Sequence, residues 1–225
     1  MKRVYFDNNA TTPLAPEVFE ALRPYLLEDY GNASSIHWFG QRAKAGIEKA
    51  REQVARLLGA RPSEIVFTSG GTESDNAAIL GIVEAARGER KHVVTTAIEH
   101  PAVLSTAKLL ERRGVSVTYV RVGPSGVIEP EDIERALRPE TVLISVMHAN
   151  NELGTVQPLE EIGRLARDRD IYFHTDAVQS AGKVPLDVEK LGASSPNFAP
   201  GHGSVARSCC AMSGKRRDKP AESGG

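Results

Sequence analysis

Strand-like and helix-like stretches alternate through the middle of this 225-residue chain, and this alternation constrains the fold more than any other feature. Short runs rich in Val, Ile and Thr each give way to apolar residues at helical spacing, with Gly, Pro or Asn at the junctions. The predicted elements are strands at 65–68, 92–96, 115–120, 142–147 and 171–174, and helices at 72–86, 101–113, 130–137 and 159–169. Repeated strand–helix–strand units predict an α/β fold with a mostly parallel sheet and helices on both faces.

The two ends of the chain differ in character. Two helices are predicted near the start, at 16–26 and 39–58, the second ending at Gly59. Residues 194–225 lack strand or helix periodicity and are rich in Ser, Gly, Arg and Lys, so we predict a disordered tail there.

Charge and cysteine content exclude several classes of function. The net charge is -1, which offers no electrostatic basis for binding nucleic acid or an anionic membrane. The two cysteines, Cys209 and Cys210, are adjacent, so neither a disulfide framework nor a Cys-rich metal site is expected. Asp7 lies where a signal peptide needs apolar residues, and no apolar run approaches membrane-spanning length. We expect a cytoplasmic protein without nucleic-acid or membrane partners.

The loop after the first predicted strand is a candidate phosphate site. Ser69, Gly70, Gly71 and Thr72 open a helix, where unpaired N–H groups and the positive end of the helix dipole attract anions. The same residues are equally typical of an ordinary capped turn with Ser69 or Thr72 as the N-cap. The Gly-Lys-Ser/Thr ending of a Walker loop is missing.

Three further loops carry polar residues at the carboxyl ends of predicted strands, where α/β sheets bind ligands. His100 could stack on a flat ring or simply satisfy local hydrogen bonds. Asn151 could contact a ligand or form a turn. Asp176 could cap a helix or keep a pyridine nitrogen protonated, with Gln179 bonding a ring substituent. Together with the phosphate loop, these residues describe a pocket for pyridoxal phosphate.

Five separated motifs closely resemble the cysteine desulfurases, a branch of the class V aminotransferase-like, fold-type I pyridoxal phosphate enzymes. The motifs are YFDNNATT (5–12), FTSGGTESDN (67–76), EHPAV (99–103), HANNELGTVQP (148–158) and FHTDAVQSAGK (173–183). The resemblance covers residues 3 to about 193. It implies an incomplete pyridoxal phosphate-binding large domain at 1–193, followed by an aberrant tail at 194–225.

The resemblance also implies roles for single residues at the cofactor. Gly71 and Thr72 match the family's phosphate-binding pair, and His100 matches the imidazole stacked on the ring. Asp176 matches the carboxylate that pairs with the ring nitrogen.

Two more positions match residues that contact the ring and its 3-hydroxyl, namely Asn151 and Gln179. The implied reaction removes sulfur from L-cysteine and leaves L-alanine and an enzyme persulfide for iron–sulfur cluster assembly or thiolation. The implied partners are a second copy in a homodimer and a sulfur-acceptor or scaffold protein.

The resemblance stops after Ala193, just before the family's Schiff-base lysine. Counting from Asp176 places His202 at the lysine position, and aligning the Gly-His pair places Gly203 there; neither can form a Schiff base. Lys215 lacks the family's surrounding residues. We hypothesise a frameshifted terminus, in which the Cys209–Cys210 pair is incidental and the persulfide cysteine region is missing.

The expected consequence is a chain that is inactive alone, with non-covalent binding of pyridoxal phosphate still open. The alternative is a non-catalytic fragment that binds the cofactor or joins a full-length partner.

Overall fold

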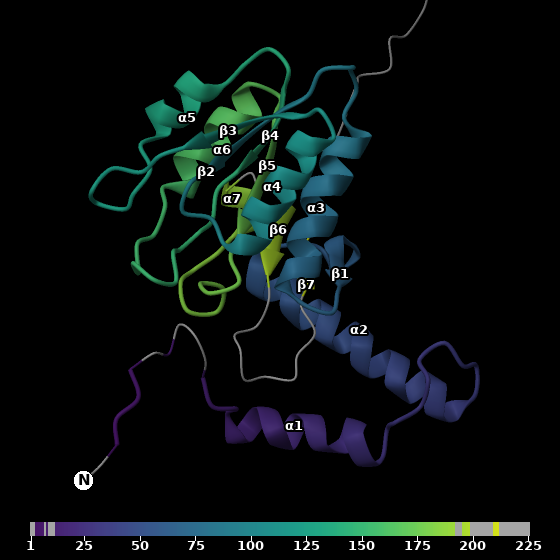
Figure 1. Ribbon diagram of the computed structural model, residues 1–225. Helices are drawn as coiled ribbons and strands as arrows, with labels where there is room; N and C mark the ends of the chain where they lie inside the picture. Colours follow the sequence, from purple (N-terminus) through teal and green to yellow (C-terminus); the bar gives the residue numbers. More distant parts are fainter. Residues whose placement is uncertain (1–2, 7, 9–11, 192–194, 199–208, 212–225) are drawn as a thin grey trace, which may run out of the picture.

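A seven-stranded sheet forms the centre of the computed structural model, which describes residues 3–6, 8, 12–191, 195–198 and 209–211 (Figure 1). The strand order is β1-β7-β6-β5-β4-β2-β3. The strands are β1 (Ile65–Phe67), β2 (His92–Thr96), β3 (Ser116–Val120), β4 (Thr141–Ser145), β5 (Tyr172–Asp176), β6 (Ser195–Phe198) and β7 (Cys209–Ala211). All pairs from β3 to β6 are parallel, while β7 runs antiparallel to both of its neighbours, which confirms the predicted sheet type.

The helices begin and end within two residues of their predicted limits. They are α1 (Pro16–Leu27), α2 (Trp38–Leu58), α3 (Gly71–Ala85), α4 (Pro101–Arg112), α5 (Pro130–Ala136) and α6 (Leu159–Asp168), with a 3-10 turn at Pro62–Glu64 and a short α7 (Val188–Leu191). Proline starts α1, α4 and α5, where its missing N–H costs nothing. Gly59 ends α2 in the left-handed conformation, with φ of 67°.

Helices cover both faces of the sheet because apolar residues alternate along its strands. On one face, Val93 of β2 and Leu143 of β4 pack with apolar residues of α3 and α4. The next residues along each strand, Val94 and Ile144, belong to the core that α5 and α6 cover on the other face (Figure 1). The carboxyl ends of the parallel strands therefore open between two helical layers.

Two strands lie within the segment for which the sequence predicted no regular structure. Strand β6 continues the parallel sheet, pairing Ser195 with His174 and Asn197 with Asp176. Strand β7 then fills the space between β6 and β1. The prediction of a wholly disordered tail was wrong for these two segments, because backbone pairing with an open strand edge requires no hydrophobic period. The rest of residues 194–225 lies outside the described part of the chain.

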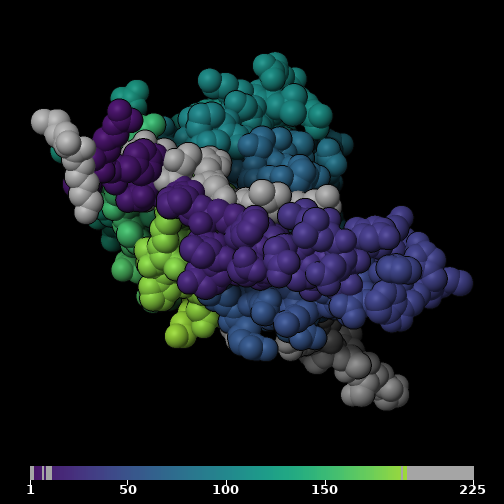
Figure 2. Space-filling view, turned by 90° about the horizontal axis from the view of Figure 1, so that it is seen from below, coloured from purple at the N-terminus to yellow at the C-terminus, as the bar shows by residue number. Residues whose placement is uncertain are grey.

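Helix α1 and the first part of α2 project from this body and expose apolar side chains, whereas the end of α2 packs into the core through Ala55 and Leu58 (Figure 1). Helix α1 has no buried residue. Ile36 and Trp38, at the start of α2, are 94% and 61% exposed. Figure 2 shows α1 and the segment after it running across the outside of the molecule. Among the described helices, none combines the length and apolar character that a membrane span requires.

Candidate functional site

The amino-terminal end of α3 lies directly after β1 and carries the predicted phosphate loop. Gly70 is the N-cap residue, its backbone is extended, and no side chain caps the helix. The ordinary capped turn with Ser69 or Thr72 as N-cap is therefore not formed. Instead, the Glu73 carboxylate accepts hydrogen bonds from the N–H of Ser69 at 2.7 Å and from its hydroxyl, which lowers the pKa of Glu73. The loop is shaped by its own residues, and its helix end is suited to an anion.

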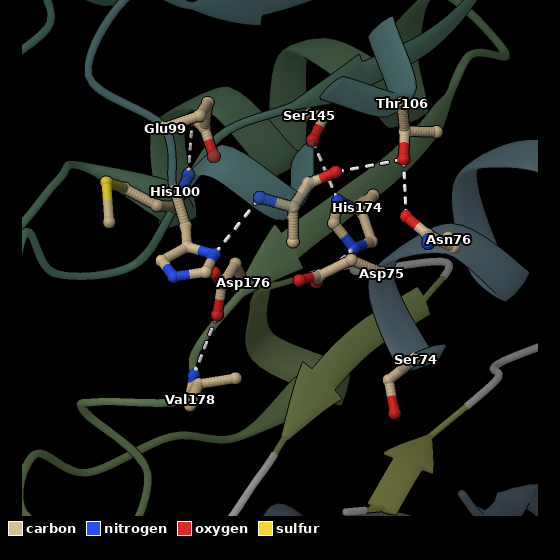
Figure 3. A network of polar contacts seen from close by, with 12 residues as sticks. Ser74, Asp75, Asn76, Glu99, His100, Thr106, Ser145, His174, Asp176 and Val178 are labelled. Atoms are coloured by element: carbon tan, nitrogen blue, oxygen red, sulfur yellow. Dashed lines mark hydrogen bonds and ion pairs between the residues drawn. The ribbon is translucent and has the colours of Figure 1, made fainter. Parts of the chain in front are cut away.

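His100 occupies the N-cap position of α4, at the carboxyl end of β2. Its Nδ1 accepts a hydrogen bond from the N–H of Ala102 at 3.1 Å, as the local alternative predicted. In a neutral ring the proton then lies on Nε2. The ring nonetheless lies beside two carboxylates, since a ring nitrogen of His100 and one carboxylate oxygen each of Asp75 and Asp176 lie within 4.8 Å of one another (Figure 3).

Asp176 is the last residue of β5 and is 6% exposed. One carboxylate oxygen accepts a hydrogen bond from the N–H of Val178 at 2.9 Å. Burial raises the pKa of Asp176 to about 6, and the negative charge of Asp75 adds to this rise. The Val178 N–H and the imidazoles of His174 and His100 oppose it. A positive group at this carboxylate would relieve the cost of keeping it charged.

A buried network of polar side chains lies beside Asp176 and was not predicted from the sequence. His174, two residues earlier on β5, has its Nε2 3.6 Å from an Asp75 oxygen and its Nδ1 2.7 Å from the Ser145 hydroxyl (Figure 3). Asp75 and His174 are 1% and 0% exposed. Two periodicities could have indicated the network: residues two apart share one face of a strand, as His174 and Asp176 do, and residues three apart share a helix face, as Thr72 and Asp75 do.

The remaining predicted contacts lie in two loops beside this cluster. Asn151 follows β4 and Gln179 follows β5, and both side chains are half-buried. The loops are joined by His148 Nδ1 and the Ser180 hydroxyl at 2.8 Å. Asn150 shapes the first loop, because its side-chain oxygen accepts hydrogen bonds from the N–H groups of two following residues. The cofactor roles of Asn151 and Gln179 remain predictions.

A pocket of about 430 Å³ lies between α3 and α4 and brings two predicted residues together. Its lining includes Thr72, Asn76 and His100. Asn76 and Thr106 are hydrogen-bonded to each other in the same lining. His100 belongs both to this lining and to the carboxylate cluster, so the pocket adjoins the cluster, although Asp176 is not among the described residues that line it. His202, Gly203 and Lys215, the positions considered for the Schiff-base lysine, lie outside the described residues.

Glu99 is a fully buried acid next to this cluster. Its Oε1 accepts hydrogen bonds from the Thr96 hydroxyl at 2.6 Å and the Met147 N–H at 2.9 Å, tying the loop after β2 to the end of β4. Its Oε2 has no hydrogen-bond partner in the described part of the chain. Burial raises the pKa of Glu99 to about 8, with Asp176 and Asp75 adding to the rise. Glu99 is therefore mostly a neutral acid at pH 7.

We expect the free energy of unfolding to fall as the pH rises from 6.5 to 8. The folded chain keeps the Glu99 proton up to about pH 8, whereas the unfolded chain releases it near its ordinary pKa of 4.5. Burial lowers the pKa of His92 to about 4 and also lowers the pKa of His148, so both histidines oppose this loss until their unfolded-state protons have been released, and the loss is clearest above about pH 7. Above pH 6.5 the loss should reach up to about 1.4 kcal/mol per pH unit. Urea denaturation at pH 6.5, 7.2 and 8 measures it.

Glu99→Gln should remove this slope, because a neutral amide replaces the neutral acid at every pH. The matched control is Glu160→Gln on the exposed face of α6, which should keep the slope. A wild-type chain whose stability does not change between pH 6.5 and 8 would show that Glu99 ionises normally.

A family model for aminotransferase class V matches residues 4–198. The chain belongs to the aminotransferase class V family. Two similar proteins, both named cysteine desulfurase IscS, come from Methanosarcina thermophila, with 54% identity over 190 residues, and Dictyoglomus turgidum, with 51% over 193 residues. The alignments cover 84% and 85% of this chain but 47% and 49% of those proteins. The chain spans about half the length of the curated relatives it matches.

Two solved structures resemble this aminotransferase class V chain in fold. One, described as SspA in complex with cysteine, is 42% identical with a TM-score of 0.88, covering 92% of this chain and 60% of the other. The second, a NifS-like protein, is 41% identical with a TM-score of 0.90, covering 97% and 60%. These matches confirm the predicted fold class and the resemblance to the amino-terminal portion of cysteine desulfurases.

Proposed function

We propose that this chain is the cofactor-binding part of a cysteine desulfurase, which removes sulfur from L-cysteine and passes it to iron–sulfur cluster or thiolation pathways. The observation that carries the proposal is the placement, at one edge of the sheet, of an uncapped helix end and a buried carboxylate that favours a positive partner. The relatives are named cysteine desulfurases, and the solved SspA structure contains cysteine. Because the chain spans about half of those relatives, the complete reaction is proposed only for a protein that includes the remaining half.

The described residues fit pyridoxal phosphate at both ends. The first turn of α3, with Gly71 and Thr72, offers N–H groups and a positive dipole end to the phosphate. Asp176 offers a buried carboxylate to a protonated ring nitrogen, and burial together with the charge of Asp75 raises its pKa, so a positive partner there would be favoured. His100 lies beside that carboxylate, in position to contact a ring bound there.

Bound pyridoxal phosphate supplies an electron sink through its protonated ring. In this chain, Asp176 would keep the proton on the ring nitrogen, and Asn151 and Gln179 would orient the ring. The α5 and α6 side of the sheet keeps the rear of the site dry, because Phe173 and Ile144 are fully buried behind it. L-cysteine is the proposed substrate, and a second copy and a sulfur acceptor are the proposed partners of the whole protein.

The purified chain is expected to bind pyridoxal phosphate non-covalently and at least about tenfold more tightly than pyridoxal, because only the former has an anion for the α3 terminus. Equilibrium dialysis of both compounds at pH 7.5 measures the ratio. With pyridoxal phosphate equimolar to the chain, borohydride should attach no cofactor at positions 202 or 203, since neither His202 nor Gly203 carries an amine for the aldehyde, and any scattered label should lie on exposed lysines such as Lys183. Equal affinity for the two compounds would contradict the phosphate role of Gly71 and Thr72, and covalent labelling would identify another reactive lysine.

A second candidate function is that of a non-catalytic partner of a full-length relative. The exposed apolar residues of the amino-terminal segment favour it, including Phe6 at 89% and Leu26 at 66% exposed. Size-exclusion chromatography with and without a full-length desulfurase distinguishes the two, because co-elution supports pairing and separate elution opposes it.

A further inference from the structure

Asp75 is a buried carboxylate that none of the predicted roles uses. It lies on α3, one helical turn after Thr72, and is 1% exposed. A carboxylate oxygen of Asp75 lies within 4.8 Å of a carboxylate oxygen of Asp176 and of a ring nitrogen of His100. Helix α3 therefore presents its amino terminus to the proposed phosphate site and a carboxylate to the proposed ring-nitrogen site.

Four titratable groups surround Asp75. His174 and Asp176 approach it from β5, His100 from the start of α4, and Glu99 from the loop after β2. His174 is fixed by the Ser145 hydroxyl at 2.7 Å, so its other nitrogen is held toward Asp75 (Figure 3).

Two buried carboxylates so close together repel one another, and the ring nitrogen of His174 that faces them lies 3.6 Å from Asp75. His100 balances the charge of Asp176 only in part, because its side chain is exposed and its Nδ1 accepts a hydrogen bond from α4. A ligand cation at Asp176 would balance it. A protonated pyridine ring has that charge, whereas a neutral ring of the same shape does not.

We propose that Asp75, held by His174, is a positioning residue that makes the Asp176 site selective for a protonated pyridine ring. The inference rests on the proposed function, because it needs pyridoxal phosphate as the ligand. Asp75 acts through Asp176. Its negative charge makes ionised Asp176 unfavourable unless a positive group binds beside it, and a protonated ring nitrogen is such a group. An uncharged residue at position 75 would leave the phosphate site intact and remove part of this selectivity.

The test compares two probes with the full chain at pH 7.5: pyridoxal phosphate and its 1-deaza analogue, in which carbon replaces the ring nitrogen. We expect the wild-type chain to bind pyridoxal phosphate at least about tenfold more tightly than the analogue. Asp75→Asn should reduce this ratio about three- to tenfold, by weakening pyridoxal phosphate while sparing the analogue. The ratio is the useful readout because damage to packing weakens both probes alike.

Asp168→Asn is the matched control, because Asp168 lies exposed at the end of α6, and its ratio should equal that of the wild type. If circular dichroism shows Asp75→Asn to be unfolded, Asp75→Ser replaces it, with the same expected fall. A folded variant with an unchanged ratio would overturn the role of Asp75. If the wild-type chain binds the two probes equally, the ring-nitrogen selectivity fails while phosphate binding stands. If it binds neither probe, the proposed function fails and the inference fails with it.

Discussion

Replacing Asp176 with asparagine is expected to weaken the binding of pyridoxal phosphate by about ten- to a hundredfold, the usual worth of a buried charge-assisted hydrogen bond. The asparagine oxygen can still accept the 2.9 Å hydrogen bond from Val178, so the loop after β5 keeps its shape. What is lost is the negative charge opposite the ring nitrogen. Equilibrium dialysis with pyridoxal phosphate at pH 7.5 measures the loss, and Asp168→Asn, with the same chemical change on the surface, should show none.

The same substitution should stabilise the cofactor-free chain. Burial and Asp75 raise the pKa of Asp176 from 3.8 to about 6. The unfolded chain therefore releases this proton at a lower pH than the folded chain, and the free energy of unfolding falls as the pH rises from 3.8 to 6. An uncharged residue removes this cost at pH 7, a gain on the order of 1 to 3 kcal/mol. The negative charge of Asp176 should strengthen cofactor binding but lower the stability of the cofactor-free chain, a trade-off found at many functional sites. A variant that loses stability and binds as well as the wild type would contradict both assignments.

The sequence predicted the elements well and the site in part, for different physical reasons. Strands and helices follow from local periodicity, which is why α3 and β5 lie within two residues of their expected limits. His100 and Asp176 meet because parallel strands end at one edge, a rule that needs only the strand order.

The polar network depends instead on tertiary packing. Asp75 lies about one hundred residues from His174 and Asp176 on β5. Its place on the helix face of Thr72 can be seen in the sequence, but its burial against β5 cannot. Strands β6 and β7 were likewise missed, since their backbone pairs with the sheet while their sequence has no β period. The burial that raises the pKa of Glu99 could not be predicted either, because it arises from the packing of the loop after β2 against the residues that follow β4.

Gly163→Ala is expected to cost about 3 kcal/mol or more of unfolding free energy, because α6 and α7 touch at this glycine without room for a methyl group. A Cβ at position 163 would lie 1.7 Å from the Leu191 carbonyl oxygen and 3.3 Å from a ring carbon of Phe173. The oxygen belongs to backbone whose N–H is bonded to Asp187, so α7 must move as a unit. Thermal melting should show a fall of roughly 6 to 12 °C.

Gly81→Ala supplies the opposite expectation at a matched position. Gly81 is also inside a helix, α3, but a Cβ there would meet nothing within 4 Å. Alanine loses less backbone entropy on folding than glycine, so this variant should gain about 0.5 to 1 kcal/mol. If both variants raised the melting temperature, helix propensity alone would explain them and the close approach at Gly163 would be wrong. A fall for Gly163→Ala together with a rise for Gly81→Ala would support a close backbone contact between α6 and α7, in which the Leu191 carbonyl fills the space that a side chain at position 163 would need.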